Sequence, residues 1–339
     1  MKKMIALLLA LLMAVGMLAG CAKQNDDDTN DTTDELRIVT TIFPAYDWVK
    51  EILGDKADHA DITMLLDNGV DLHSYQPTAD DIVKISDCDL FLYVGGESEG
   101  WVEDALKNSA NKDRKVINLL DVLGDSVKSE EVVEGMQEEE HEHEEGEAHE
   151  HEDGEAHEHE EEADEHVWLS LKNAEVLVGA ISDALQELDA ENKDIYAANA
   201  DVYMKKLSAL DAEYQTAVDN ATRKTVLFGD RFPFRYLADD YGLNYYAAFV
   251  GCSAETEASF ETISFLAKKA DELKLPCVLT IEGKHHKIAE TIVKNTAQKS
   301  QRILTMDSMQ STTSKDVASG TTYLSVMEKN LAVLKEALA

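Results

Sequence analysis

The feature that most constrains the fold of this chain is a regular alternation of short apolar runs with amphipathic stretches, which begins at residue 37. Each apolar run has the length of a buried strand, and the stretches between the runs have the periodicity of helices. The eight runs span residues 37–42, 61–66, 89–94, 115–120, 225–229, 244–250, 277–282 and 302–306. The pattern predicts an α/β protein with two similar halves, each built around a mostly parallel sheet.

A long helical pattern connects the two halves. Residues 183–220 contain neither proline nor glycine. Six side chains recur there at three- and four-residue steps, the spacing of one helix face: Tyr196, Ala200, Tyr203, Leu207, Leu210 and Tyr214. A helix of about 30 residues would be roughly 45 Å long and could join two lobes rigidly. A core helix of the second half would show the same pattern.

A repeat rich in histidine and glutamate interrupts the first half. It reads HEHEEGEA, HEHEDGEA and HEHEEE from His141 onward, and residues 130–165 hold 20 acids without a lysine or arginine. Because the repeat has almost no apolar surface to bury, we expect residues 129–165 to form a disordered loop. Its flexible histidine pairs would have to be ordered on binding, which predicts weak auxiliary metal sites: His141, His143, His149, His151, His157 and His159.

The N-terminal residues have the features of a targeting segment. Two lysines precede an apolar run at residues 4–18, which is short for a membrane span of about 20 residues. The run ends in LAGC, and this sequence resembles the lipobox of bacterial lipoprotein precursors. The resemblance implies a signal peptide at residues 1–20, lipid on Cys21 and an acidic tether at residues 21–35. The protein would then be lipid-anchored on the outer face of the cytoplasmic membrane.

Charge and cysteine content exclude several classes of function. The formal net charge is −37, which disfavours binding to nucleic acid and adhesion to anionic lipid headgroups. Three cysteines follow Cys21, namely Cys88, Cys252 and Cys277, and none belongs to a CxxC motif. Such a sparse set predicts neither a disulfide framework nor a sulfur-rich metal site. We interpret all three as small buried side chains at strand ends.

Two histidines outside the repeat lie in sequence contexts that suit a metal ligand. His73 lies in GVDLHSYQPTADDI, between a predicted strand and a predicted helix, and His166 lies in DEHVWLSLKNA, where the repeat gives way to an apolar run. A neutral imidazole in such a loop binds zinc and similar ions well. Taken singly, however, a histidine is more often structural than ligating.

Three segments resemble one known protein family. GVDLHSYQPT resembles the G-x-D-P-H-x-Y-E-P segment of the metal-binding solute-binding proteins of bacterial ABC transporters, the cluster A-I group that serves zinc and manganese uptake. DEHVWLSLKNA is similar to that family's D-P-H-x-W-L-x-P, and IYAANADVYMKKLSALDAEY to its linker-helix pattern. The resemblance covers nearly the whole mature chain, and the His-rich repeat places the chain with the zinc-type members.

The resemblance implies an α/β fold with two (βα)₄ lobes, a rigid linker helix and one metal site in the cleft between the lobes. The N-terminal lobe would comprise residues 36–128 and 166–190, the linker helix residues 191–220 and the C-terminal lobe residues 221–339. In the family, two histidines of the first lobe and an acid of the second bind the metal. These positions match His73, His166 and Asp307.

The fourth family ligand, a histidine or glutamate, has no match, because GDRFPFRYLADDYGL places Arg231 at that position. A guanidinium remains protonated and cannot donate a lone pair to a metal. We predict that Asp230 supplies the missing oxygen while Arg231 turns outward or pairs with an acid. Alternatively, Arg231 bonds Asp307 and leaves only a weak site of two histidines, or no site. A ligand from another loop is a further alternative, the candidates being Glu255, Glu257 and Glu282.

The function that the resemblance implies is capture of Zn²⁺, with Mn²⁺ as the alternative ion, for delivery to an ABC permease with a cytoplasmic ATPase. We expect a monomer that binds no nucleic acid, contacts the membrane through its lipid alone and is not an enzyme. The alternatives are a manganese-type receptor, a zinc-buffering adhesin and, with less support, a zinc hydrolase. The hydrolase is disfavoured because the sequence has no HExxH signature and no identifiable general base.

Overall fold

The computed structural model describes residues 35–107, 109–137, 162–253, 257–283 and 285–339. The predicted signal peptide, Cys21, nearly all of the tether and the six repeat histidines lie outside these ranges. No helix within the described ranges is long and apolar enough to cross a membrane.

The first lobe is a parallel four-stranded sheet in the order β2-β1-β3-β4. Its buried strand residues are mostly aliphatic or aromatic, as expected for a sheet covered on both faces. The strands are β1 (Leu36–Thr40), β2 (Ala60–Met64), β3 (Leu90–Tyr93) and β4 (Lys115–Asn118). The helices are α2 (Phe43–Leu53), α3 (Ala79–Asp87), α4 (Val102–Lys107), α5 (Leu119–Leu123) and α6 (Leu171–Leu188), and 3-10 turns span η1 (Gly54–His59) and η4 (Gly124–Ser126).

The second lobe repeats this arrangement with the strand order β6-β5-β7-β8, again parallel. Its strands are β5 (Thr225–Phe232), β6 (Asn244–Val250), β7 (Cys277–Thr280) and β8 (Arg302–Thr305). Its helices are α8 (Arg235–Tyr241), α9 (Phe260–Glu272), α10 (Lys287–Asn295), α11 (Ser314–Ala318) and α12 (Tyr323–Ala337). All eight predicted strands are present, and the predicted α/β architecture with two lobes is confirmed.

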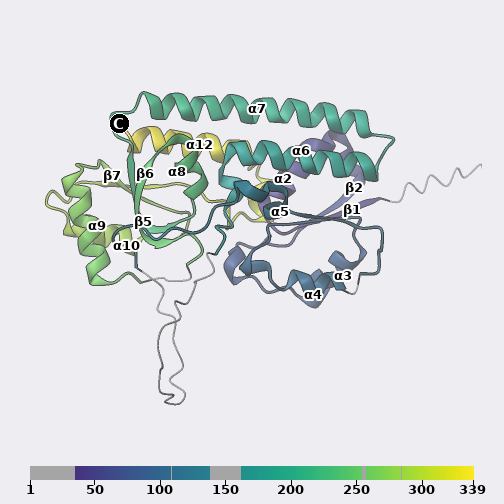
Figure 1. Cartoon of the computed structure of the whole chain (residues 1–339), viewed down its shortest axis with the longest axis horizontal. Helices are drawn as coiled ribbons and strands as arrows, with labels where there is room; N and C mark the ends of the chain where they lie inside the picture. Colours follow the sequence, from purple (N-terminus) through teal and green to yellow (C-terminus); the bar gives the residue numbers. More distant parts are fainter. Residues whose placement is uncertain (1–34, 108, 138–161, 254–256, 284) are drawn as a thin grey trace, which may run out of the picture. The chain divides into compact units, whose positions relative to one another are not determined.

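The linker helix is α7 (Lys193–Asp219), which has 27 residues. It runs across both lobes in Figure 1, above α2 and α6 and above α12. Asn199 Nδ2 of this helix donates to the carbonyl of Ile52 in α2 at 2.9 Å, and the Tyr214 hydroxyl donates to the carbonyl of Met327 in α12 at 2.6 Å. One helix face is therefore anchored to both lobes, so α7 is a connection and not a core helix of the second lobe alone.

A continuous hydrophobic core joins the lobes beneath α7. Trp168 is fully buried and donates from Nε1 to the carbonyl of Ser308 at 2.8 Å, while the Tyr323 hydroxyl donates to the carbonyl of Trp168 at 2.7 Å. Tyr323 also packs edge-on against Trp48, with ring centroids 5.2 Å apart. These contacts fix the two lobes relative to each other by packing that does not depend on a bound ion.

The two ends of the segment that we expected to be disordered are ordered. Ser129 and Ala163 form an antiparallel bridge, and the amide of Glu130 donates to the carbonyl of Glu162 at 2.9 Å. The amide of Gln137 donates to the carbonyl of Ala248 in β6 at 2.9 Å. Residues 129–137 and 162–165 thus belong to the folded body, and only residues 138–161 of the predicted loop lie outside the description.

Candidate metal centre

His73 lies in a short 3-10 turn, η2 (Leu72–Ser74), on the loop that follows β2. The turn is fixed by Asp71, whose Oδ1 accepts from the His73 amide at 3.0 Å. The ring Nδ1 lies 2.7 Å from Ser98 Oγ, in the turn η3 (Glu97–Glu99), and 3.3 Å from Glu165 Oε2. A carboxylate accepts only, so we assign the Nδ1 proton to this side of the ring and a lone pair to Nε2.

His166 directly precedes the turn η5 (Val167–Leu169) and is fully buried. Asp164 Oδ1 accepts from both the amide of His166 at 2.9 Å and its Nδ1 at 2.8 Å. Burial lowers the pKa of His166, but the charge and hydrogen bond of Asp164 more than offset this and raise it. The contact again places the ring proton on Nδ1 and leaves Nε2 as an electron-pair donor.

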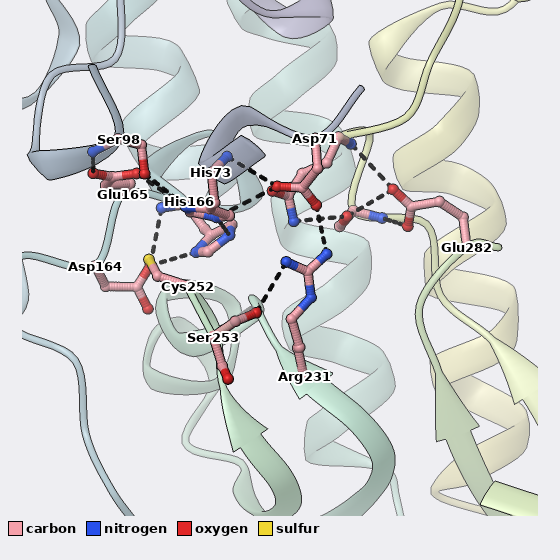
Figure 2. A network of polar contacts seen from close by, with 12 residues as sticks. Asp71, His73, Ser98, Asp164, Glu165, His166, Arg231, Cys252, Ser253 and Glu282 are labelled. Atoms are coloured by element: carbon pink, nitrogen blue, oxygen red, sulfur yellow. Dashed lines mark hydrogen bonds and ion pairs between the residues drawn. The ribbon is translucent and has the colours of Figure 1, made fainter. Parts of the chain in front are cut away.

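The two Nε2 atoms face each other 3.2 Å apart (Figure 2). Two nitrogens that each lie about 2.0–2.1 Å from a tetrahedral zinc ion are separated by about 3.3 Å. The rings therefore stand at the separation that a shared ion requires, and each is oriented by a carboxylate on its far side. Such carboxylate–histidine pairs are typical of the surroundings of bound zinc.

Glu165 contacts both His73 and Ser98 through its buried carboxylate. Burial raises the pKa of Glu165, but hydrogen bonds from His73 and from Ser98 lower it by more than this, so the net shift is downward. Its Oε1 accepts from the Ser98 amide at 2.9 Å. The charge of Glu165 is therefore retained in a buried position, where it favours a cation.

Cys252 completes a group of three potential ligands with the two histidines. One ligating atom of each residue lies within 4.8 Å of the others. Among the described residues, these three side chains form a group that could hold a metal ion. Our interpretation of Cys252 as a buried side chain is wrong, because the residue is only partly buried and belongs to this group of potential ligands. Cys88 and Cys277 are buried, as expected. Burial, and then the charge of Glu130, raise the pKa of the Cys252 thiol.

Arg231 occupies β5 and turns toward the first lobe. Its Nη2 forms an ion pair of 2.5 Å with Asp71 Oδ2, and its Nη1 donates to the carbonyl of Ser253 at 3.3 Å (Figure 2). Burial raises the pKa of Asp71, but the charge of Arg231 outweighs it, so the net shift is downward. The alternative in which Arg231 bonds Asp307 is wrong, since its acidic partner is Asp71.

The structure does not bring Asp230 and Asp307 into the group of three. Asp230 Oδ1 accepts from the Arg231 amide at 3.0 Å and its Oδ2 from the Ile281 amide at 3.4 Å. Asp307 Oδ1 accepts from the Met309 amide at 2.8 Å. Burial, and then the charge of Glu282, raise the pKa of Asp307 to about 6.

The other proposed donors of the second lobe have different surroundings. Glu282 accepts from the amides of Ser308 and Gln310 at 2.7 and 3.1 Å and so holds the loop after β8. Glu257 is exposed, and Glu255 lies outside the described residues. An open cavity of about 700 Å³ lies beside Asp71 and Arg231 and is lined chiefly by the second lobe.

Sequence reasoning identified the two histidines but missed the residues that orient them and the thiol beside them. The two acids could have been predicted from the sequence DEH, where Asp164 and Glu165 directly precede His166. Cys252 was readable from its place two residues after a predicted strand, because ligands of parallel sheets bind at the carboxyl ends of strands. No local signal in the sequence indicated Ser98.

Comparison with known proteins places the chain in a family. The model of the family described as "ZnuA: Zinc-uptake complex component A periplasmic" matches residues 38–337. The zinc-binding lipoprotein AdcA of Streptococcus pneumoniae TIGR4 is 34% identical over 336 residues, which are 99% of this chain and 61% of AdcA. The high-affinity zinc uptake system protein ZnuA of Bacillus subtilis is 31% identical over 323 residues, 95% of this chain and 94% of that protein. The chain thus spans less than two thirds of AdcA.

Solved structures agree with this placement. The Zn(II)-bound ZnuA-like domain of S. pneumoniae AdcA superposes with a TM-score of 0.67 at 29% identity and covers 90% of this chain and 99% of that one. The metal-dependent lipoprotein YcdH of B. subtilis gives a TM-score of 0.69 at 26% identity, with coverage of 90% and 99%. The match spans both lobes and α7, and the chain belongs to the ZnuA family of solute-binding proteins of bacterial zinc ABC transporters.

Proposed function

We propose that this protein is an extracytoplasmic receptor that captures Zn²⁺ and delivers it to an ABC permease driven by a cytoplasmic ATPase. The observation that carries the proposal is the pair of Nε2 atoms of His73 and His166, 3.2 Å apart and each oriented by a buried carboxylate. Two imidazoles held in this way favour zinc over manganese, which prefers oxygen ligands. The names of AdcA and ZnuA, which refer to zinc, support the same ion.

The acids of the second lobe remain part of this proposal. Asp307 directly precedes Ser308, whose carbonyl accepts from Trp168, two residues after His166. We propose that Asp307 becomes a further ligand by exchanging its hydrogen bond with the Met309 amide for the ion. Asp230 is adjacent to Arg231, which bonds Asp71 of the His73 loop. We keep Asp230 as the alternative oxygen donor.

The proposed location follows from the N-terminal sequence and from the AdcA name, which includes the word lipoprotein. Lipid on Cys21 would anchor a monomeric receptor to the outer face of the cytoplasmic membrane, with residues 21–35 as a tether. The six repeat histidines would collect zinc weakly near the cleft. The permease then receives the ion from the folded body.

Members of this family are solute-binding receptors, and we propose that this chain likewise binds without turnover. Glu165 and Asp164 contact the Nδ1 atoms of the histidines. Asp71, whose Oδ1 lies 3.9 Å from His73 Nε2, has its other oxygen paired with Arg231, which disfavours it as a general base. A panel of ester, amide and phosphate substrates tests this. Zinc-dependent turnover would contradict the receptor function.

Zinc titration of the protein tests the proposed function directly. We expect one tight equivalent of Zn²⁺ in addition to weak ones, and strong discrimination against Mn²⁺. His73→Ala should abolish the tight equivalent. Asp307→Ala and Asp230→Ala, measured in parallel, identify which acid contributes, because the non-ligating acid leaves the affinity unchanged. Absence of a tight equivalent in the parent protein would overturn the proposal.

A further inference from the structure

Cys252 is a residue of the second lobe that lies beside the histidine pair. It belongs to the same group as His73 and His166, in which one donor atom from each residue lies within 4.8 Å of the others. His166 is fully buried, and its Nε2 lies 3.2 Å from Nε2 of His73. The thiol therefore lies close to both imidazoles, with the Glu130 carboxylate and the Glu165 backbone as its other polar neighbours.

The backbone around Cys252 is held against the histidines. The Cys252 amide donates to Glu130 Oε1 at 2.8 Å. The preceding residue is Gly251, and a Cβ added there would lie 3.0 Å from both Nδ1 and Cε1 of His166. A Cβ at this position would crowd the ring, so glycine favours the close approach of the chain after β6. Gly251 thereby lets the next side chain reach the site.

Arg231 connects the loops that carry Cys252 and His73. Its Nη1 donates to the carbonyl of Ser253, the residue after Cys252, and its Nη2 pairs with Asp71, the carboxylate that caps the His73 turn. The guanidinium cannot ligate a metal, but its planar fork fixes two groups at once. Arg231, which occupies the position of the expected family ligand, thus holds the loop that carries Cys252 against the loop that carries His73.

We infer that Cys252 is the third protein ligand to the captured ion, giving a site of two imidazole nitrogens and one thiolate. This rests on the proposed function and specifies its selectivity. A thiolate is a soft donor that favours zinc and disfavours manganese, and three protein ligands leave one tetrahedral position for Asp307 or water. A bound cation deprotonates a coordinating thiol. The proton released passes to solvent.

The test uses Co²⁺ as a spectroscopic substitute for zinc in the full chain. A coordinated thiolate gives an intense sulfur-to-cobalt charge-transfer band in the near ultraviolet, which histidine and carboxylate ligands do not give. We expect the band in the parent protein and in the control variants Cys88→Ala and Cys277→Ala. Cys252→Ser and Cys252→Ala should lack it.

Zinc affinity measured on the same variants supplies the second readout. Loss of Cys252 should weaken zinc binding at the tight site by at least roughly 10- to 100-fold, the loss expected for a residue that only hydrogen-bonds to a ligand. It should also reduce the preference for Zn²⁺ over Mn²⁺. Tight zinc binding in the parent with no charge-transfer band, and unchanged affinity in Cys252→Ser, would overturn the thiolate ligand while leaving the receptor function intact. A parent that binds no zinc tightly would overturn both.

Discussion

The two lobes contribute to the metal centre in different ways. On the side of the first lobe, both histidine rings have their Nδ1 atoms engaged by carboxylates, and the side chains of His73 and His166 are 7% and 0% exposed. On the side of the second lobe, Asp230 and Asp307 accept hydrogen bonds from backbone amides, and Arg231 is paired with Asp71. The histidines of the candidate site are preformed, whereas Asp230 and Asp307 would have to exchange hydrogen-bond partners to reach an ion.

This difference indicates where affinity and selectivity arise. Two rigid imidazoles lose little freedom when an ion binds, so they should supply most of the affinity. The second lobe chooses among sulfur and oxygen donors and should therefore govern which metal is retained. Substitutions in the two lobes can separate these roles.

The largest effect should follow His166→Ala. It removes one of the two fixed nitrogen donors and the ring partner of the buried Asp164, so we expect zinc to bind roughly 1000-fold more weakly, or about 4 kcal/mol. Isothermal titration measures this, and circular dichroism checks that the variant folds. His285→Ala is the matched control, because His285 is exposed. Equal losses of zinc affinity in the two variants would contradict the assignment of His166 as a ligand.

A substitution away from the metal centre tests whether the joining core is independent of it. Asp47 of α2 accepts from the Tyr323 amide at the start of α12 at 2.9 Å, and burial raises its pKa from 3.8 to about 6. Its contribution to stability is fully present below pH 3.8 and is lost as the pH rises through about 6. Asp47→Asn keeps an oxygen acceptor without the charge.

We therefore expect Asp47→Asn to be more stable than the parent at pH 7, by about 2 to 3 kcal/mol, and equally stable near pH 4. Denaturant unfolding at the two pH values measures the difference. Zinc affinity should not change. A change in affinity would show that the joining core and the metal centre are coupled.

The next largest effect should follow Asp164→Ala, which tests whether zinc binding by His166 depends on its carboxylate partner. Asp164→Ala removes the acceptor of His166 Nδ1 and should weaken zinc binding roughly 10- to 100-fold. Asp125→Ala removes an exposed acid of the same lobe and serves as the control for charge. If both variants lose affinity equally, general attraction of cations accounts for the effect and orientation of the ring does not.

The smallest effect on the tight site should come from deleting residues 138–161. We expect the tight equivalent of zinc to bind with unchanged affinity and the weak equivalents to disappear, because His73, His166 and Cys252 all lie outside the deleted segment. Titration to saturation counts the equivalents. Loss of the tight equivalent would show that the principal zinc site lies in the repeat and not between the two lobes.

Much of the fold was predictable because its signals are local. Eight apolar runs of strand length and the stripe from Tyr196 to Tyr214 determine the strands and α7, since burial on both sheet faces and on one helix face leaves a direct pattern in the chain. His73 and His166 were predictable from their contexts and from family resemblance. The boundaries of the repeat loop were less predictable, because Ser129 and Ala163 pair across 33 intervening residues.

By itself, the sequence determined that two α/β halves, a long connecting helix and two histidines belong together in a metal-binding protein. Only the tertiary structure decided which side chains meet around the two histidines. Cys252, Arg231 and Asp71 are far apart in sequence, and their proximity depends on how β6, β5 and the loop after β2 converge. Composition and spacing report burial and local conformation, whereas a binding site is a set of distances between atoms that the folded chain alone fixes.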